Sequence, residues 1–252
     1  SAHVIYPMGL IVKPDKVRMV VDGKPTNVYL ALMGFKPSPI DEVNQIIFSR
    51  ARVLTQDGKH AFYQLPISKK QSLMQCVKFY YPPFKQNITC AFTVEMFGSS
   101  NSCYRFVKLE NQLNNYFRTV GIQMANFYDD AVFLSLEYNL YVATIGSFIK
   151  RLYYVIGRQL NESKTDLLVG TQEFKFRGFM WNTRTMQFYP LPKLLKSTNQ
   201  YINDIKNSLG RQILIKKLVS TMGKISYMGH SMPYISILLS PLKDIMRVLH
   251  HK

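Results

Sequence analysis

Short apolar segments separated by turn residues dominate the first forty residues of the chain. Ile11-Val12 and the alternating segment 17–21 flank a turn-type tetrapeptide at 13–16. Apolar and polar residues that alternate beside a short turn are typical of a β-hairpin. The pattern therefore predicts a hairpin with basic residues at its turn and along one strand.

The middle of the chain, residues 43–192, mixes the patterns of strands and helices. Apolar residues at helical spacing include Tyr104, Val107, Leu113 and Tyr116. This mixture predicts an α+β fold in which helices pack on one face of a sheet. Strands are predicted at 53–54, 92–94 and 131–134, and helices over 103–119, 138–158 and much of 193–252.

Composition narrows the class of protein. The 252 residues include 32 Lys or Arg against 15 Asp or Glu, a formal charge of +17, and 47% are hydrophobic. A chain this apolar can form a core, which excludes a disordered polycation. A strongly basic folded protein attracts polyanions, and nucleic acid is the first partner to consider. No apolar run reaches the roughly 18 residues of a membrane span. Three cysteines without metal-site spacing favour a reducing, intracellular location.

Acidic residues are scarce, and the sharpest cluster is Asp129-Asp130, between apolar segments that fit two strands of a hairpin. Paired aspartates are common in turns, where they bind nearby backbone amides. Alternatively, they act together with Asp57, which follows the strand predicted at 53–54. Bridging carboxylates are what two neighbouring divalent cations require, because hard cations prefer oxygen ligands. The sequence by itself leaves both interpretations open.

An ordered set of motifs resembles the palm motifs of reverse transcriptases. The chain is similar to the reverse transcriptase (RNA-directed DNA polymerase) domain of retroelements, most of all to the DIRS-type and LTR retrotransposon polymerases. Segment 179–186 resembles the DIRS-type elements. Segments 13–27 and 217–224 resemble the fingers hairpin and the thumb. The palm motifs are Asp57-x-x-x-Ala61-Phe62, Phe97-Gly98, Phe127-Tyr128-Asp129-Asp130, Lys164 and Phe176-Arg177-Gly178-Phe179.

The resemblance implies a right-hand polymerase that adds dNTPs to a primer 3′-hydroxyl on an RNA template. Its partners would be the template, the primer-template duplex and dNTPs, with no membrane. RNase H and recombinase or integrase domains would lie outside this chain, which would be a processed or excised polymerase module. Fingers are expected at 1–42 and 66–97, the palm with an antiparallel sheet at 43–65 and 98–192, and a basic helical thumb at 193–252.

The resemblance also implies a role for each motif residue. The three aspartates would hold two Mg²⁺ ions, for which Mn²⁺ can substitute, and Lys164 would donate a proton to the leaving pyrophosphate. As simpler alternatives, the basic residues are surface charges, the aromatic residues belong to a core and the glycines serve turns. The expected metal ligands are Asp57, Asp129 and Asp130, the dNTP-binding residues are Lys13, Arg18, Phe62, Phe97 and Gly98, and the primer grip is Phe176, Arg177, Gly178 and Phe179.

Four departures from the family pattern keep a second function open. His60 replaces an acidic residue, Glu95-Met96 replaces an apolar residue and proline, Ser102-Cys103 replaces Ala-Pro, and Arg177 replaces leucine. These departures concern template handling and the level of activity more than the metal site, whose three aspartates are intact. The alternative is a catalytically inactive reverse transcriptase-like domain retained for binding RNA or protein.

Overall fold

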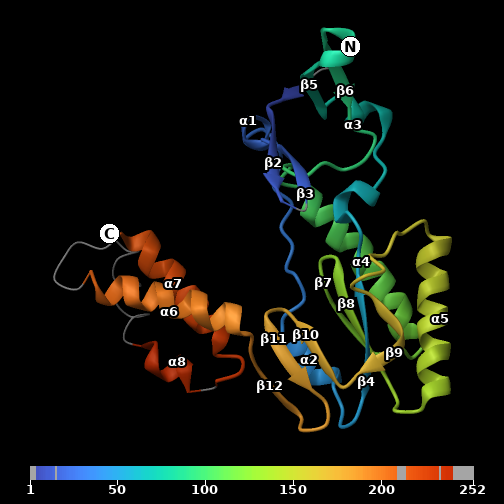
Figure 1. Cartoon of the computed structure of the whole chain (residues 1–252), viewed down its shortest axis with the longest axis vertical. Coiled ribbons are helices and arrows are strands. Elements are labelled where there is room, and N and C mark those ends of the chain that lie inside the picture. Colours follow the sequence, from blue (N-terminus) through green and yellow to red (C-terminus); the bar gives the residue numbers. More distant parts are fainter. Residues whose placement is uncertain (1–3, 15, 209–213, 233, 241–252) are drawn as a thin grey trace. The chain divides into compact units, whose positions relative to one another are not determined.

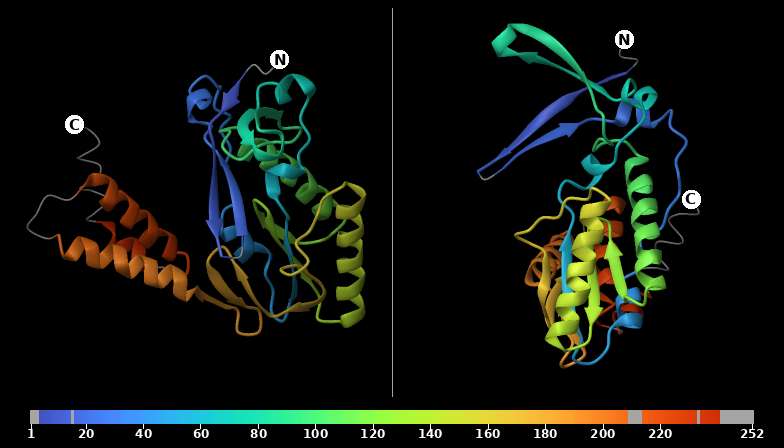
Figure 2. Two further views of the ribbon diagram at one scale, coloured as in Figure 1. Left: turned by 45° about the horizontal axis from the view of Figure 1, so that its top comes forward. Right: turned by 90° about the vertical axis from the view of Figure 1, so that its right-hand side faces the viewer.

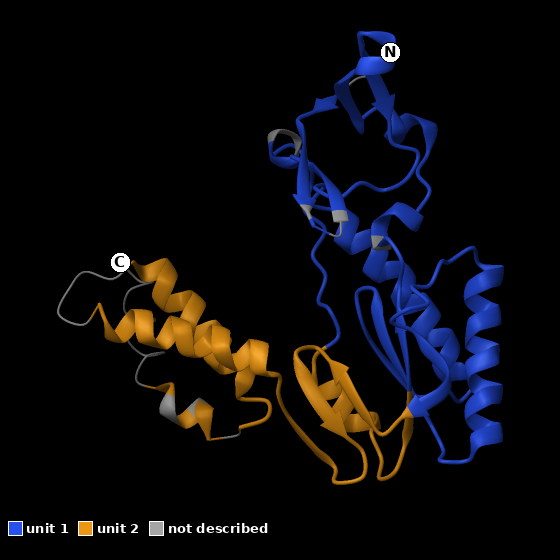
Figure 3. Ribbon diagram, viewed as in Figure 1, with its two compact units in different colours: residues 1–38, 54–170 blue, residues 39–53, 171–252 orange. Residues whose placement is uncertain are grey.

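The computed structural model describes residues 4–14, 16–208, 214–232 and 234–240, which form two compact units (Figures 1 and 3). The first unit comprises Ser1–Ser38 and Leu54–Gly170, and the second comprises Pro39–Val53 and Thr171–Lys252. The division into fingers, palm and thumb stays a prediction.

The first unit contains two hairpins and a four-stranded sheet. Its N-terminal elements are β1 (Ile5–Tyr6), β2 (Met8–Lys13), β3 (Lys16–Val21) and α1 (Lys24–Asn27). Next come β4 (Arg52–Asp57), η1 (Ala61–Gln64), α3 (Lys69–Ser72), β5 (Cys76–Tyr81), η2 (Pro82–Phe84) and β6 (Gln86–Ala91). The unit ends with α4 (Ser102–Thr119), β7 (Met124–Phe127), β8 (Asp130–Ser135), α5 (Asn139–Val155) and β9 (Asp166–Thr171).

The predicted N-terminal hairpin is confirmed, because β2 and β3 pair antiparallel from Met8↔Val21 to Lys13↔Lys16. A second hairpin, β5–β6, joins β1 in a three-stranded sheet. Figure 2, right, shows both hairpins extending beyond the helices of this unit. The strand predicted at 92–94 is wrong: β6 ends at Ala91, and Val94 makes only an isolated bridge to Pro66. Phe92 instead packs on the core formed by Tyr6, Val21, Val77 and Met96.

The four-stranded sheet, in the order β7-β8-β4-β9, has α4 and α5 on one face. One buried cluster joins Leu54 of β4 and Phe133 of β8 to Phe117 of α4 and Ile149 of α5. This confirms the predicted helices and their packing on one face. The buried face of α4 differs from the one predicted by apolar spacing, since Tyr116, one of the spaced apolar residues, is 44% exposed. The side chains that α4 buries are Ser102, Phe106, Val107, Glu110, Asn114 and Phe117.

The second unit contains a three-stranded antiparallel sheet and four helices among its described residues. Stacking of Trp181 on Phe188, with ring centroids 4.2 Å apart, forms its aromatic centre. Thr183 ties the segment around Ala51 to this sheet, because its hydroxyl donates to the Ala51 carbonyl (2.8 Å). The elements are α2 (Asp41–Ile46), β10 (Glu173–Phe176), β11 (Phe179–Asn182), β12 (Gln187–Pro190), α6 (Pro192–Lys206), α7 (Ile215–Met228) and α8 (Ile235–Leu238).

Candidate active site

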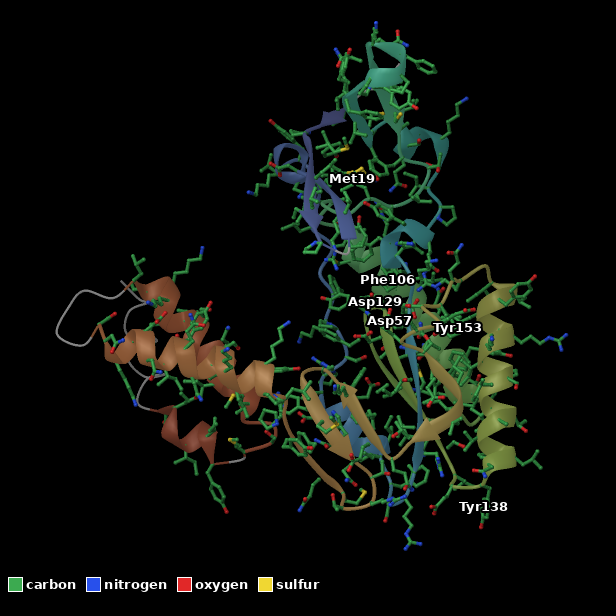
Figure 4. The ribbon with its side chains drawn as sticks, in the orientation of Figure 1. Met19, Asp57, Phe106, Asp129, Tyr138 and Tyr153 are labelled. Atoms are coloured by element: carbon green, nitrogen blue, oxygen red, sulfur yellow. The ribbon has the colours of Figure 1, made fainter. Side chains whose placement is uncertain are left out.

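Two aspartates far apart in sequence meet at one end of the four-stranded sheet. Asp57 is the last residue of β4, and Asp129 lies in the two-residue loop between β7 and β8, which Phe127↔Asp130 closes. The backbone N–H of Gly58 donates to the carbonyl of Asp129 at 2.7 Å. Figure 4 shows Asp57 and Asp129 next to each other, with Phe106 nearby. The hairpin turn predicted at Asp129 is therefore confirmed.

Local backbone geometry makes this approach possible. A Cβ at position 58 would lie 3.3 Å from the Cβ of Asp129, which is closer than most such contacts, so the glycine leaves room for the hairpin. Tyr128 has a φ of 56°, in the left-handed region that bulky residues rarely adopt. Strain of this kind is often found where a loop holds a functional side chain.

The three carboxyl groups influence one another electrostatically. Burial raises the pKa of Asp129, and the charge of Asp57 raises it further, against a backbone hydrogen bond and the cations Lys164 and Arg158. Desolvation, followed by the charges of Asp129 and Asp57, raises the pKa of Asp130 to about 6. Like charges in one site disfavour ionisation of each member. The cluster is therefore an acidic site that a cation would stabilise.

Lys164 lies at this site as well. Its Nζ donates to Oδ2 of Asp57 at 3.0 Å, and this hydrogen bond is the main reason that the pKa of Lys164 is raised. The lysine side chain is 65% exposed and that of Asp57 is 17% exposed. Asn161 and Thr165 fix the same loop, through hydrogen bonds with the backbone of Asp57.

An aromatic cluster contains the two residues expected beside the nucleotide. The ring centroid of Phe62 is 4.6 Å from that of Phe97 and 5.4 Å from that of Phe106. Gly98 has a φ of 116° and its carbonyl accepts from the side-chain amide of Asn27 (2.9 Å), which places this turn against the base of the β2–β3 hairpin. The structure thus brings Phe62, Phe97 and Gly98 into one region.

The other predicted residues are not brought to the carboxylates by any described contact. Arg18 is exposed on β3, opposite Ile11, and the side chain of Lys13 lies outside the described part. The primer-grip segment belongs to the second unit. There Phe176 and Phe179 are buried and paired, and the two-residue loop between them has positive φ at both positions, as in a type I′ hairpin. Its residues are Arg177 and Gly178.

Sequence reasoning missed a buried ion pair near the site. The Arg158 guanidinium binds the carboxylate of Glu110, and the two side chains are 4% and 3% exposed. The signal was present in α4, since Glu110 and Asn114 occupy positions in the buried stripe between Phe106 and Phe117. Polar residues within an apolar helical stripe indicate a buried polar network.

Metal-free protein is expected to lose stability as the pH rises from about 5 to about 8. Burial raises the pKa of Glu110 to about 7, and that of Asp130 is about 6, whereas both have lower values in the unfolded chain. The folded state binds more protons in this window, so its free energy of unfolding falls as these groups ionise. Urea unfolding in a chelator, at several pH values, measures the slope.

The double variant Glu110→Gln/Asp130→Asn removes both groups and should flatten this dependence. Its absolute stability is not the readout, since Glu110→Gln also weakens the pairing of Arg158. A slope equal to that of the unmodified protein would contradict the assignment of the two groups.

The carboxylates suit a hard divalent cation, because such cations prefer oxygen ligands and a bound cation would offset the repulsion between the carboxylates. As arranged, they do not form a ready ligand set: no group of three potential ligands is found among the described residues.

Among the described residues, no helix is long and apolar enough to span a bilayer.

Comparison with known proteins supports the fold. No family model and no curated protein matches the sequence. A foamy viral protease-reverse transcriptase bound to double-stranded DNA matches 98% of the chain with a TM-score of 0.69 and 17% identity. The structure of that viral protein with an RNA/DNA hybrid matches 88%, with a TM-score of 0.58 and 18% identity. The chain spans 40% and 27% of the lengths of the protein chains in these two structures. It therefore has the right-hand polymerase fold of the reverse transcriptases.

Proposed function

We propose that this chain is an RNA-directed DNA polymerase that transfers dNTPs to a primer 3′-hydroxyl. The observation that carries the proposal is the meeting of Asp57 and Asp129 at adjacent strand ends, within a reverse transcriptase-like fold. The fold relatives, bound to double-stranded DNA and to an RNA/DNA hybrid, support a primer-template duplex as the partner. The excess of 17 positive charges favours the same class of ligand.

Asp57 and Asp129, with Asp130, would hold two Mg²⁺ ions. Bound there, the ions would lower the pKa of the primer hydroxyl and neutralise charge on the triphosphate and pyrophosphate. Lys164 is bonded to Asp57 in this structure, so its ammonium would have to leave that carboxylate to donate a proton to the leaving group. Arg18, and Lys13 with it, would bind phosphate oxygens. The remaining work of the chain is to position the primer and nucleotide.

Extension of an oligo(dT) primer on poly(rA) tests this function directly. Labelled dTTP incorporation is expected with Mg²⁺ or Mn²⁺, and it should disappear in a chelator. An inactive wild-type chain with both metals would overturn the proposal. Salt-sensitive binding of the same duplex without incorporation would instead support an inactive domain retained for binding RNA.

Phe62 is expected to exclude ribonucleotides. Its ring contacts those of Phe97 and Phe106. If the sugar of the incoming nucleotide packs on this ring, a ribose 2′-hydroxyl would clash with it. Phe62→Ala should raise the kcat/KM for UTP relative to that for dTTP by about tenfold or more. Steady-state incorporation of the two nucleotides on poly(rA)/oligo(dT) gives this ratio.

Tyr63→Ala is the matched control, because the Tyr63 ring also contacts Phe97, at a centroid distance of 4.9 Å. If Phe62 contacts the sugar, only Phe62→Ala changes the discrimination. Equal changes in both variants would mean that the aromatic cluster was merely loosened, and would contradict a specific role for Phe62.

A further inference from the structure

The buried pair Glu110–Arg158 lies beneath the candidate active site and has no part in the proposed chemistry. Glu110 comes from the middle of α4, whereas Arg158 follows α5 and donates its backbone N–H to the Tyr153 carbonyl at 2.8 Å. Burying two charges costs several kcal/mol per ion, and apolar replacements of similar size are often neutral or stabilising. Stability alone therefore does not account for a charged pair at this place.

Arg158 is in contact with the residues that support the catalytic hairpin. Its guanidinium carbon lies 4.8 Å from the ring centroid of Phe106. Phe106 forms a buried cluster with Leu65, and Tyr128, the residue of unusual φ that immediately precedes Asp129, packs against this cluster. The Phe106 ring also contacts Phe62.

The backbone beside Arg158 belongs to the frame of the site. The Gln159 carbonyl accepts from the N–H of Lys59 (2.9 Å), and the N–H of Asn161 donates to the carbonyl of Asp57 (2.9 Å). Gln159 also exchanges two hydrogen bonds of 2.9 Å with the side chain of Gln64, in the turn that carries Phe62. A shift of Arg158 would therefore reach the segment around Asp57 and the turn that carries Phe62.

The pair with Glu110 involves Nη2 of Arg158 and leaves another guanidinium nitrogen without a described hydrogen bond. That nitrogen, Nη1, is buried and has no hydrogen-bond partner among the described residues. Burial is the main reason that the pKa of Asp129 is raised, and the positive charge of Arg158 acts against that rise.

We propose that Arg158, held in place by Glu110, is a positioning residue for Asp129. Its planar guanidinium supports Phe106, which belongs to the cluster that Tyr128 packs against, and so fixes the Asp129 carboxylate before a divalent cation binds. This inference rests on the proposed function. It predicts that weakening this support lowers metal affinity even in the absence of substrate.

The test measures Mn²⁺ binding by calorimetry and primer extension for three variants. Glu110→Leu/Arg158→Met replaces the pair by apolar side chains and should fold with a Tm close to that of wild type. Its Mn²⁺ affinity should fall about fivefold or more and its kcat about tenfold, with duplex affinity unchanged. Arg158→Lys keeps the charge but lacks the planar group that packs on Phe106, and should lose about threefold in Mn²⁺ affinity. Asp129→Asn sets the level of binding without the site.

Wild-type Mn²⁺ affinity and kcat in the folded double variant would overturn the inference, because the pair would then be only structural. If the double variant fails to fold, Arg158→Lys decides: wild-type Mn²⁺ affinity and kcat in that variant would overturn the inference, and the stated loss would support it. A wild-type chain that binds Mn²⁺ no better than Asp129→Asn would overturn the proposed function and this inference with it.

Discussion

Asp129→Asn is expected to abolish primer extension, with a loss of at least about a thousandfold in kcat, without loss of the fold. The amide keeps the size of the carboxylate but removes a charge that both metal ions would need, and electrostatic stabilisation is the main source of catalysis in phosphoryl transfer. Incorporation of dTTP on poly(rA)/oligo(dT), measured at saturating metal and nucleotide, gives the loss directly.

The same variant should not be less stable than wild type in a chelator. Burial and the charge of Asp57 raise the pKa of Asp129, which means that its ionised form is disfavoured in the metal-free fold. Removing that charge therefore relieves repulsion. Lower activity together with equal or higher stability separates a catalytic role from a structural one.

Glu162→Gln is the matched control for the change of charge. Glu162 is an exposed carboxylate in the loop that carries Lys164, and its replacement should leave kcat within about twofold of wild type. A residual activity above a tenth of wild type in Asp129→Asn would contradict its assignment as a metal ligand.

Gly146→Ala is expected to cause a large loss of stability, about 3 kcal/mol or more. Gly146 is buried in α5, where an added Cβ would collide with the backbone carbonyl of Leu167 in β9. The helix would have to move away from the sheet and open the core around Ile145 and Ile149. Alanine favours helices over glycine by about 1 kcal/mol, which is too little to offset this clash.

Gly223→Ala in α7 is the matched control, because a Cβ there meets no atom of the described residues within 4 Å. The gain in helix propensity should stabilise α7 by about 0.5–1 kcal/mol. Urea and thermal unfolding of both variants measure the two effects, which are opposite in sign. A Gly146→Ala variant as stable as wild type would show that α5 does not lie this close to β9.

Local signals in the sequence predicted several elements of the first unit. The β2–β3 hairpin, the turn at Asp129 and helix α5 all follow from short-range patterns of apolar residues and turn residues. These elements are set by neighbours in sequence, so a periodic pattern suffices to find them.

Elements that depend on long-range packing could not be predicted in this way. Residues 92–94 look like a strand, yet the side chain of Phe92 packs on a core contributed by other segments. The apolar spacing placed Tyr116 on the buried face of α4, whereas Tyr116 is 44% exposed and Glu110 and Asn114 are buried, because the surroundings of a helix come from other segments. Local pattern also placed Asp57 at the end of a strand, but its contact with the Asp129 loop depends on the order of strands in the sheet.

The backbone hydrogen bond from Gly58 to Asp129 makes the contact between the two aspartate-bearing segments measurable by hydrogen exchange. This single amide joins the strand that ends in one carboxylate to the loop that presents the other. Its exchange with solvent deuterium therefore measures how often the two segments separate, at one resolved position and with no substrate present. Slower exchange at Gly58 on adding a divalent cation or a primer-template would show that the ligand holds these two segments of the candidate active site together.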